Sequence, residues 1–174
     1  MIIRIAEPED AKKIKELYQQ VARSSNTIIR LENEITDEYV EEFIKRSLEK
    51  GLILVAEHEE APGKIIGEIH AYSPGIHAFR HIFSNLTIAV HPNFQGRKIG
   101  RTIFTIFQEE IALNKTDIGK VELIVRESNT KAIQFYQALG FQIEGRFEMR
   151  IRTAQNTYEA DIPMSWQNPN FEFD

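Results

Sequence analysis

The chain has 174 residues, a net charge of −5 and no cysteine, and we expect residues 1–174 to form one domain of ordinary size. The absence of cysteine excludes a disulfide framework, a thiolate zinc site and a cysteine nucleophile, and it fits a reducing compartment. The acidic balance argues against general nucleic-acid binding, which favours basic surfaces. The first residues do not resemble a signal peptide and no apolar run could span a bilayer, so we expect a cytoplasmic protein without a membrane partner.

The first third of the sequence predicts a strand followed by two helices. Residues 2–6 read as a short strand, and Pro8 with two acidic residues after it is typical of a first helical turn. The apolar face of the first helix is expected at Ile14, Leu17, Tyr18 and Val21. Thr36 can cap a second helix that ends at Gly51. The inward face of this second helix is expected at Val40, Phe43, Ile44 and Leu48.

The rest of the chain predicts mostly strands. Residues 52–56 and 65–72 flank a Pro-Gly turn and read as a hairpin. Two strand–helix units follow, and their strands and helices are expected, in turn, at residues 81–90, 98–113, 120–126 and 129–139. Alternating strands over residues 141–151 and 157–166 close the chain. Pro163 predicts an edge position for the last strand, which could then pair between subunits of a homodimer.

This order of elements, β-α-α-β-β-β-α-β-α-β-β, indicates an α/β fold of the α+β type. The strand–helix units in the middle require some parallel pairing, whereas the hairpins require antiparallel pairing. We therefore expect a mixed, mostly antiparallel sheet of about seven strands flanked by about four helices.

The segment between the predicted strand 81–90 and the helix after it has the features of an anion site. It carries two glycines and three cations in the run Gln95-Gly96-Arg97-Lys98-Ile99-Gly100-Arg101. A helix N-terminus presents unpaired N–H groups and a partial positive charge, which suit a phosphate or pyrophosphate. An ordinary turn with solvated charges explains the same residues equally well. The spacing fits neither a Walker loop nor the dinucleotide fingerprint.

Two signatures make the sequence resemble the GNAT superfamily of N-acetyltransferases. Gln95 and Gly100 match the ends of its acyl-CoA-binding motif, Gln/Arg-x-x-Gly-x-Gly/Ala, whereas Lys98 replaces the middle glycine. That replacement matters little if Lys98 has ordinary helical backbone angles. Residues 129–141 are similar to the second signature, N-x-x-A-x-x-F-Y-x-x-x-G-F, at every marked position. The opening of the chain also resembles the usual start of the family, so the likeness covers almost the whole sequence.

The resemblance implies that the central strands splay apart and that acetyl-CoA, the co-substrate, enters the gap. The backbone of Ile88, Ala89 and Val90 would pair with the pantetheine arm, and amides from Gly96 to Arg101 would hold the pyrophosphate. Asn129 would contact the pantetheine near Ala132, and Tyr136 would face the thioester sulfur. The cofactor-binding residues so implied are Ile88, Ala89, Val90, Gln95, Gly96, Arg97, Lys98, Ile99, Gly100, Arg101, Asn129, Ala132 and Tyr136.

The expected catalytic residues are Tyr136, Glu68 and His70. Tyr136 can donate a proton to the departing thiolate as a general acid. Many relatives carry a glutamate base about where Asn85 stands, and an amide cannot accept a proton at neutral pH. Glu68 and His70 share one face of a strand and are therefore the candidate bases, with His81 or a water chain as alternatives.

The resemblance implies an N-acetyltransferase that moves an acetyl group to a primary amine directly in a ternary complex. A non-catalytic acyl-CoA-binding module is the alternative, because no obvious base is present, and a nucleic-acid patch on the three cations is a third. We expect no metal site, because the histidines at 70, 77 and 81 are more simply explained as sheet or loop residues. The acceptor stays open among a protein N-terminus, a lysine, a polyamine, an amino acid and an aminoglycoside.

Overall fold

The computed structural model describes residues 1–24 and 28–172. The helices in this part of the chain are α1 (Ala11–Ser24), α2 (Asp37–Lys50), α3 (Ile99–Asn114) and α4 (Thr130–Gln137). The strands are β1 (Ile2–Ile5), β2 (Gly51–Glu57), β3 (Ile65–Tyr72), β4 (Ile82–Val90), β5 (Lys120–Arg126), β6 (Gln142–Ile143), β7 (Phe147–Arg152) and β8 (Tyr158–Gln167). None of the helices described is long and apolar enough to cross a membrane.

The eight strands form one mixed sheet in the order β1-β2-β3-β4-β5-β8-β6, with β7 paired to β8. Only β4 and β5 pair in parallel among the described strands, and every other pairing is antiparallel. The prediction of a mixed, mostly antiparallel sheet with flanking helices is thus confirmed, with eight strands in place of about seven.

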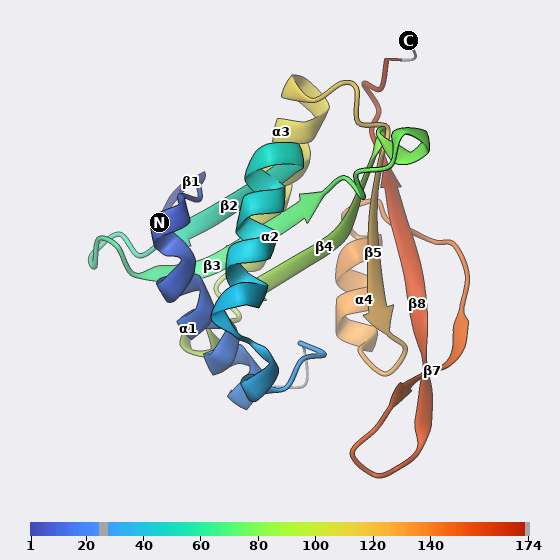
Figure 1. Ribbon diagram of the computed structural model, residues 1–174, viewed down its shortest axis with the longest axis horizontal. Helices are drawn as coiled ribbons and strands as arrows, with labels where there is room; N and C mark the ends of the chain where they lie inside the picture. The colour runs from blue at the N-terminus through green and yellow to red at the C-terminus, as the bar shows by residue number, and fades with distance from the viewer. Residues whose placement is uncertain (25–27, 173–174) are drawn as a thin grey trace.

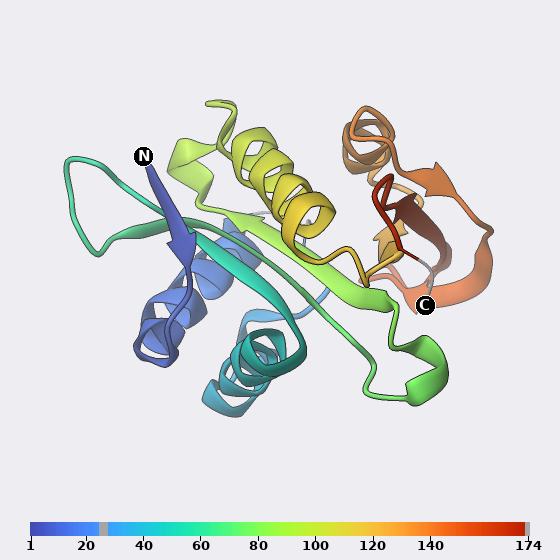
Figure 2. The same cartoon turned by 90° about the horizontal axis from the view of Figure 1, so that it is seen from above.

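The helices cover both faces of the sheet (Figures 1 and 2). In the view from above, α1 and α2 lie on one face, whereas α3 and α4 lie on the other. Strand β2 shows why both faces are needed, because its side chains alternate between the two cores. Leu52 and Leu54 pack in the core beneath α3, while Ile53 and Val55 pack in the core beneath α1 and α2. Such burial on both faces explains the continuous apolar run of this strand.

Two expectations about exposure were wrong. Leu48 is 40% exposed, and Ser47 is buried in α2 in its place. Leu48 lies about 80° around the helix from Val40, at the margin of the buried face. The alternating pattern of residues 141–151 does not form one half-buried strand, because the chain divides into β6 and β7. Met149 in β7 is 68% exposed, since the β7–β8 hairpin extends away from the helices.

The expected edge position of the last strand was also wrong. Strand β8 pairs with β5 along one side, and β6 and β7 occupy its other side. Pro163 stands opposite Ile124 in β5, and its carbonyl accepts a hydrogen bond from the amide of Glu144. The proposed pairing of β8 between two subunits therefore has no free edge to use within the described chain.

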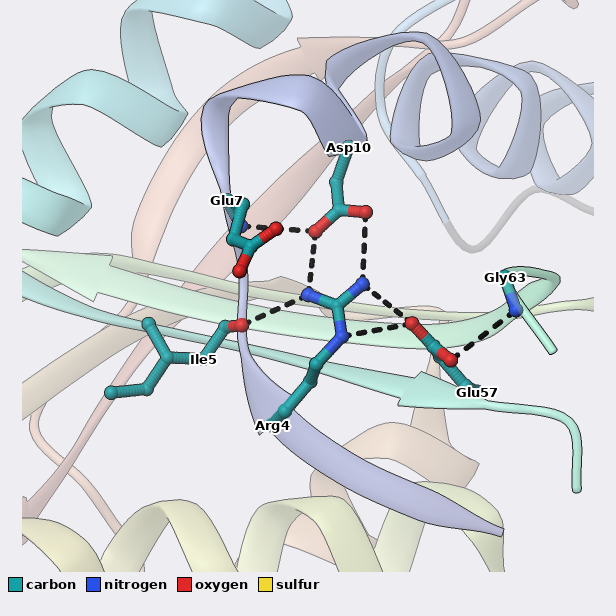
Figure 3. Close-up of polar contacts among 6 residues, drawn as sticks. All are labelled: Arg4, Ile5, Glu7, Asp10, Glu57 and Gly63. Carbon is teal, nitrogen blue, oxygen red and sulfur yellow. Dashed lines mark hydrogen bonds and ion pairs between the residues drawn. The ribbon is translucent and has the colours of Figure 1, made fainter.

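A partly buried ion-pair network joins the first strand to the rest of the sheet (Figure 3). The guanidinium of Arg4 donates two hydrogen bonds to Asp10, of 2.7 and 3.0 Å, and its Nε lies 2.8 Å from a carboxylate oxygen of Glu57. Asp10, whose side chain is only 4% exposed, also accepts a bond from the amide of Glu7. Burial alone would raise the pKa of Asp10, but Arg4 and the Glu7 amide outweigh it, so the pKa is lowered.

We expect Arg4→Met to lower the free energy of unfolding by about 3 kcal/mol at pH 7, because it leaves the buried Asp10 carboxylate without its cation. The pKa of Asp10 is depressed in the folded state, so this stabilisation is complete above the unfolded pKa of about 3.9 and is lost as the pH falls through the folded pKa. Urea unfolding of the parent protein and of Arg4→Met should show a smaller difference in the free energy of unfolding at pH 3 than at pH 7.

Arg23→Met provides a matched control for this prediction. Arg23 forms an exposed pair with Glu32, at 3.2 Å and with both side chains about half exposed. Such pairs contribute about 0–1 kcal/mol, so we expect a far smaller change. Equal losses for the two variants would show that the Arg4 network does not anchor β1.

Candidate functional site

Strands β4 and β5 are joined at one end only and diverge along the rest of their length. Their parallel pairing is limited to Ile82 with Lys120 and Phe83 with Val121. Beyond these pairs the two ribbons separate in Figure 1, and a cavity of about 440 Å³ opens there, lined by side chains from α2, β3, β4, β5 and α4. The predicted splay of the central strands is therefore present.

Alternate residues of β4 direct their backbone N–H and C=O groups toward this gap. The amide of His91 donates to the Ile66 carbonyl of β3, at 2.9 Å, so the neighbouring Val90 directs its polar groups to the other side. The side-chain amide of Gln95 donates to the Val90 carbonyl there, at 3.1 Å. By the same alternation Ile88 faces the gap, whereas Ala89 pairs with β3. Two of the three β4 residues expected to meet an extended ligand thus have the required orientation.

The turn before α3 leaves a row of backbone donors open. Within the described chain, the amides of residues 96–101 donate no hydrogen bond to any backbone or side-chain acceptor. Gly96 has a φ of 77°, and a side chain added there would meet nothing within 4 Å. Consecutive amides in such a turn form an anion-binding concavity, which the start of a helix reinforces. Arg97, Lys98 and Arg101 surround it with positive charge.

Lys98 does not have the helical backbone angles under which its substitution for glycine would be harmless. Its φ is 64° and its ψ is 4°, and it is the N-cap of α3, which begins at Ile99 rather than at Lys98. Left-handed angles at this residue bend the chain so that the amides on either side point the same way. The position therefore favours glycine, and lysine occupies it under strain.

We expect Lys98→Gly to raise the free energy of unfolding by about 0.5–1 kcal/mol, because glycine adopts left-handed angles without the Cβ clash. Urea denaturation of the ligand-free protein would measure it. Lys115→Gly is the matched control, since Lys115 caps the other end of α3 at a φ of −136°, where glycine relieves nothing. A lower stability for Lys98→Gly than for the parent protein would contradict the strain argument.

Helix α4 brings Asn129 and Tyr136 to the cavity. The Asn129 side chain caps the helix by accepting a hydrogen bond from the Ala132 amide, at 3.2 Å. Tyr136 lines the cavity and packs on Phe104, with ring centroids 5.9 Å apart. Its hydroxyl has no hydrogen-bond partner in the part of the chain described, and burial raises its pKa to about 12. Tyr136 therefore stays protonated at physiological pH and can donate a proton.

A second group of side chains reaches the cavity from the opposite side, through β3. His70 lines the cavity, and its Nδ1 lies 2.9 Å from a carboxylate oxygen of Glu68. The hydroxyl of Tyr18 donates to the other oxygen of Glu68, at 2.5 Å. Burial, and next the charge of Glu68, raise the pKa of Tyr18 well above its ordinary value, so it remains a donor. The carboxylate on Nδ1 favours the tautomer whose Nε2 is a free acceptor.

The two candidate bases therefore differ in their access to the cavity. Glu68 is fully buried and does not line the cavity, whereas His70 is 2% exposed and does. The ring of His70 is held by stacking on Phe43, with centroids 4.1 Å apart and planes 10° apart. Tyr18 was expected only as a core residue, yet a tyrosine on a buried helical face needs a partner for its hydroxyl, and that requirement points to such a network.

Asn85 interrupts β4 within the cavity. Its φ is 57°, and the β3–β4 register shifts beside it. The side chain is exposed and donates to the Ser84 hydroxyl, at 3.3 Å. An amide here can orient a substrate by hydrogen bonding but cannot take its proton.

The predicted residues thus fall into two neighbouring groups. The cavity collects His70, Ile88, Asn129 and Tyr136, while residues 95–101 lie beyond the Val90 end of β4. In residues 1–24 and 28–172, no group of three His, Asp or Glu side chains is arranged to hold a metal ion. The arrangement provides an anion cradle, an extended strand edge and a pocket with a proton donor on one wall and an imidazole on the other.

Comparisons with known proteins agree with this geometry. A family model described as an acetyltransferase (GNAT) domain matches residues 49–143, more than half of the chain. A GNAT-family acetyltransferase from Streptococcus pneumoniae superposes with a TM-score of 0.83 and 23% identity, covering 95% of this chain and 98% of that one. Comparison with curated proteins finds no match.

Two further solved structures have the same fold and are named for different acceptors. A ribosomal-protein-alanine N-acetyltransferase from Brucella melitensis has a TM-score of 0.80 and 21% identity, covering 96% of this chain and 99% of that one. A phosphinothricin acetyltransferase from Sinorhizobium meliloti, in complex with acetyl-CoA, has a TM-score of 0.81 and 18% identity, covering 96% of this chain and 88% of that one. The shared fold accommodates very different acceptors.

Proposed function

Because this chain belongs to the GNAT acetyltransferase family, we propose that it transfers the acetyl group of acetyl-CoA to a primary amine, directly and within a ternary complex. The observation that carries the proposal is the row of open amides at residues 96–101, next to a strand edge that leads into the cavity. The residues fit the co-substrate: the amides suit a pyrophosphate, and Ile88 and Val90 suit the amide groups of a pantetheine arm. The Sinorhizobium relative was solved with acetyl-CoA.

The chemistry assigns one proton transfer to each wall of the cavity. The nitrogen lone pair of a neutral amine forms a bond to the thioester carbon, and the carbon–sulfur bond breaks. His70 takes the proton that the nitrogen loses, with Glu68 stabilising the imidazolium that results. Tyr136 gives its proton to the departing sulfur, so the products are an amide and free coenzyme A. Solvent then returns His70 and Tyr136 to their starting protonation states.

Further roles follow for the residues around this path. Asn129 and Ala132 at the start of α4 would contact the pantetheine, and Gln95 holds the end of β4 in place through the Val90 carbonyl. Arg97, Lys98 and Arg101 would supply positive charge to the phosphates. The lack of cysteine fits action in the cytoplasm. The chain would act as one domain.

Two measurements on the same preparation test the proposal. Calorimetry with acetyl-CoA measures binding, and a thiol reagent measures coenzyme A release with a panel of primary amines. Binding together with amine-dependent thiol release supports the transferase. Binding without release for any amine would favour a non-catalytic acyl-CoA-binding module, for which the missing glutamate at Asn85 is the motivation. No binding would refute both.

A further inference from the structure

Two arginines beside the cavity carry charges that no described carboxylate neutralises. Acidic residues outnumber basic ones by 26 to 21, and carboxylates pair with Arg4, Arg23, Arg126, Arg146 and Arg150. Among the described residues, no ion pair is made by Arg30, Arg46, Arg97, Arg101 or Arg152, and Arg152 instead bonds to the side chain of Asn156. Arg97 and Arg101 stand at the proposed phosphate site, where a ligand would neutralise them. Arg30 and Arg46 stand at the other end of the site.

Both of these arginines are stacked on tyrosines that line the cavity. The guanidinium carbon of Arg30 lies 3.9 Å from the ring centre of Tyr39, and that of Arg46 lies 4.4 Å from the ring centre of Tyr72. Arg30 itself lines the cavity. A guanidinium over a ring keeps N–H groups at its edge that can donate to a carboxylate in pairs, and Arg30 also has a side-chain hydrogen bond with Tyr39.

The other charges in the cavity are already matched. Arg126 pairs with Glu159, and Glu122 shares Lys120 with Glu144, each at 2.9 Å. Asp161 accepts an ion pair from Arg150, at 3.4 Å. Of the described Arg, Lys, Asp and Glu side chains that line the cavity, Arg30 is therefore the one without a partner of opposite charge. Because the protein's own cations cover these tyrosine faces, the tyrosines do not form an aromatic cage for a second cation.

We propose that the acceptor is a small amine that also bears a carboxylate, as an amino acid does, and that Arg30 binds the carboxylate while Arg46 adds to the positive potential. The proposal rests on the proposed acetyl transfer, whose acceptor it specifies. A polyamine would bring further positive charge to this wall and is disfavoured. A protein N-terminus would bring no carboxylate next to its amine and would leave Arg30 without a partner.

Product analogues test this assignment without requiring turnover. Protein saturated with coenzyme A is titrated calorimetrically with a panel of N-acetyl-L-amino acids, and each acid is compared with its N-acetyl amino acid amide. The amide has the same shape but no charge, so it isolates the carboxylate. We expect at least one acid to bind about 10–100-fold more tightly than its amide, the range for a hydrogen-bonded charge. Arg30→Gln should remove this preference, and Arg30→Lys should restore part of it.

Arg152→Gln is the matched control, because Arg152 lies on β7 and bonds to Asn156 away from the cavity. It should keep the full preference for the acid. Acids that bind no better than their amides throughout the panel, or a preference that survives Arg30→Gln, would overturn the proposal. Coenzyme A release with neutral amines or polyamines as fast as with amino acids would also overturn it while leaving acetyl transfer intact. Failure of acetyl-CoA itself to bind would instead refute the proposed function.

Discussion

Replacing Tyr136 with phenylalanine should lower turnover at least tenfold and leave the affinity for acetyl-CoA nearly unchanged. The substitution removes only the hydroxyl that we propose as the proton donor to sulfur, and loss of a general acid typically costs 10²–10⁴-fold. The ring would still pack on Phe104 and Phe141, whose centroids lie 5.9 Å from its own. Initial rates of thiol release and calorimetric titration with acetyl-CoA measure the two effects separately.

The pH dependence of the parent protein gives a second check on Tyr136. Burial raises the pKa of this hydroxyl to about 12, so the protonated form persists through the alkaline range of an ordinary assay. The rate should therefore show no loss that follows tyrosine ionisation below about pH 11. Tyr158→Phe serves as control, because Tyr158 is 56% exposed at the start of β8. Unchanged turnover in Tyr136→Phe would remove this residue from the mechanism.

Much of the fold follows from local patterns. The bounds of β3 and β5 match the predicted residues 65–72 and 120–126, because alternation and flanking turn residues mark both strands. The first helix has its predicted buried residues, since their spacing places them on one face. Helix α4 begins after Asn129, whose side chain caps it as residue type and position suggest. Each of these elements is decided by its own sequence.

The errors arise where partners distant in the chain decide the outcome. Pro163 indicated an edge strand, yet β6 and β7 pair with β8 on the side away from β5. Lys98 has the side chain of a good helix former, but the turn that opens the amides requires left-handed angles there. A single sequence shows neither which strands pair with each other nor which backbone angles a turn requires.

The candidate site was predictable to different degrees on its two sides. Residues 95–101 and Tyr136 lie within motifs whose physical requirements can be read along the chain. The acceptor side is assembled from four separate elements, so Tyr18, Arg30 and Tyr39 carry no shared motif. Glu68 and His70 were chosen because they share a strand face, but only the folded chain shows that Glu68 is buried behind His70.

We expect His70→Gln to lower turnover about 100-fold with little change in the affinity for acetyl-CoA, because general bases typically contribute 10²–10⁴-fold. Glutamine can still donate a hydrogen bond to Glu68 but cannot accept a proton at neutral pH. Glu68→Gln should have a smaller effect, since Glu68 orients the imidazole and does not reach the cavity. His77→Gln, at an exposed residue of the β3–β4 connection, should retain full activity.

A buried histidine can also support the structure alone, so the test needs a readout that packing would not change. An acceptor is therefore compared with its hydrazide analogue, whose weakly basic nitrogen becomes more acidic once it has attacked the thioester and so gives its proton to water with less need of a base. If His70 accepts the proton, His70→Gln should slow the ordinary amine far more than the hydrazide. If packing alone were lost, both acceptors would slow equally, and urea unfolding would show a matching loss of stability. Equal slowing would transfer the role of base to a water chain that leads from the cavity to solvent.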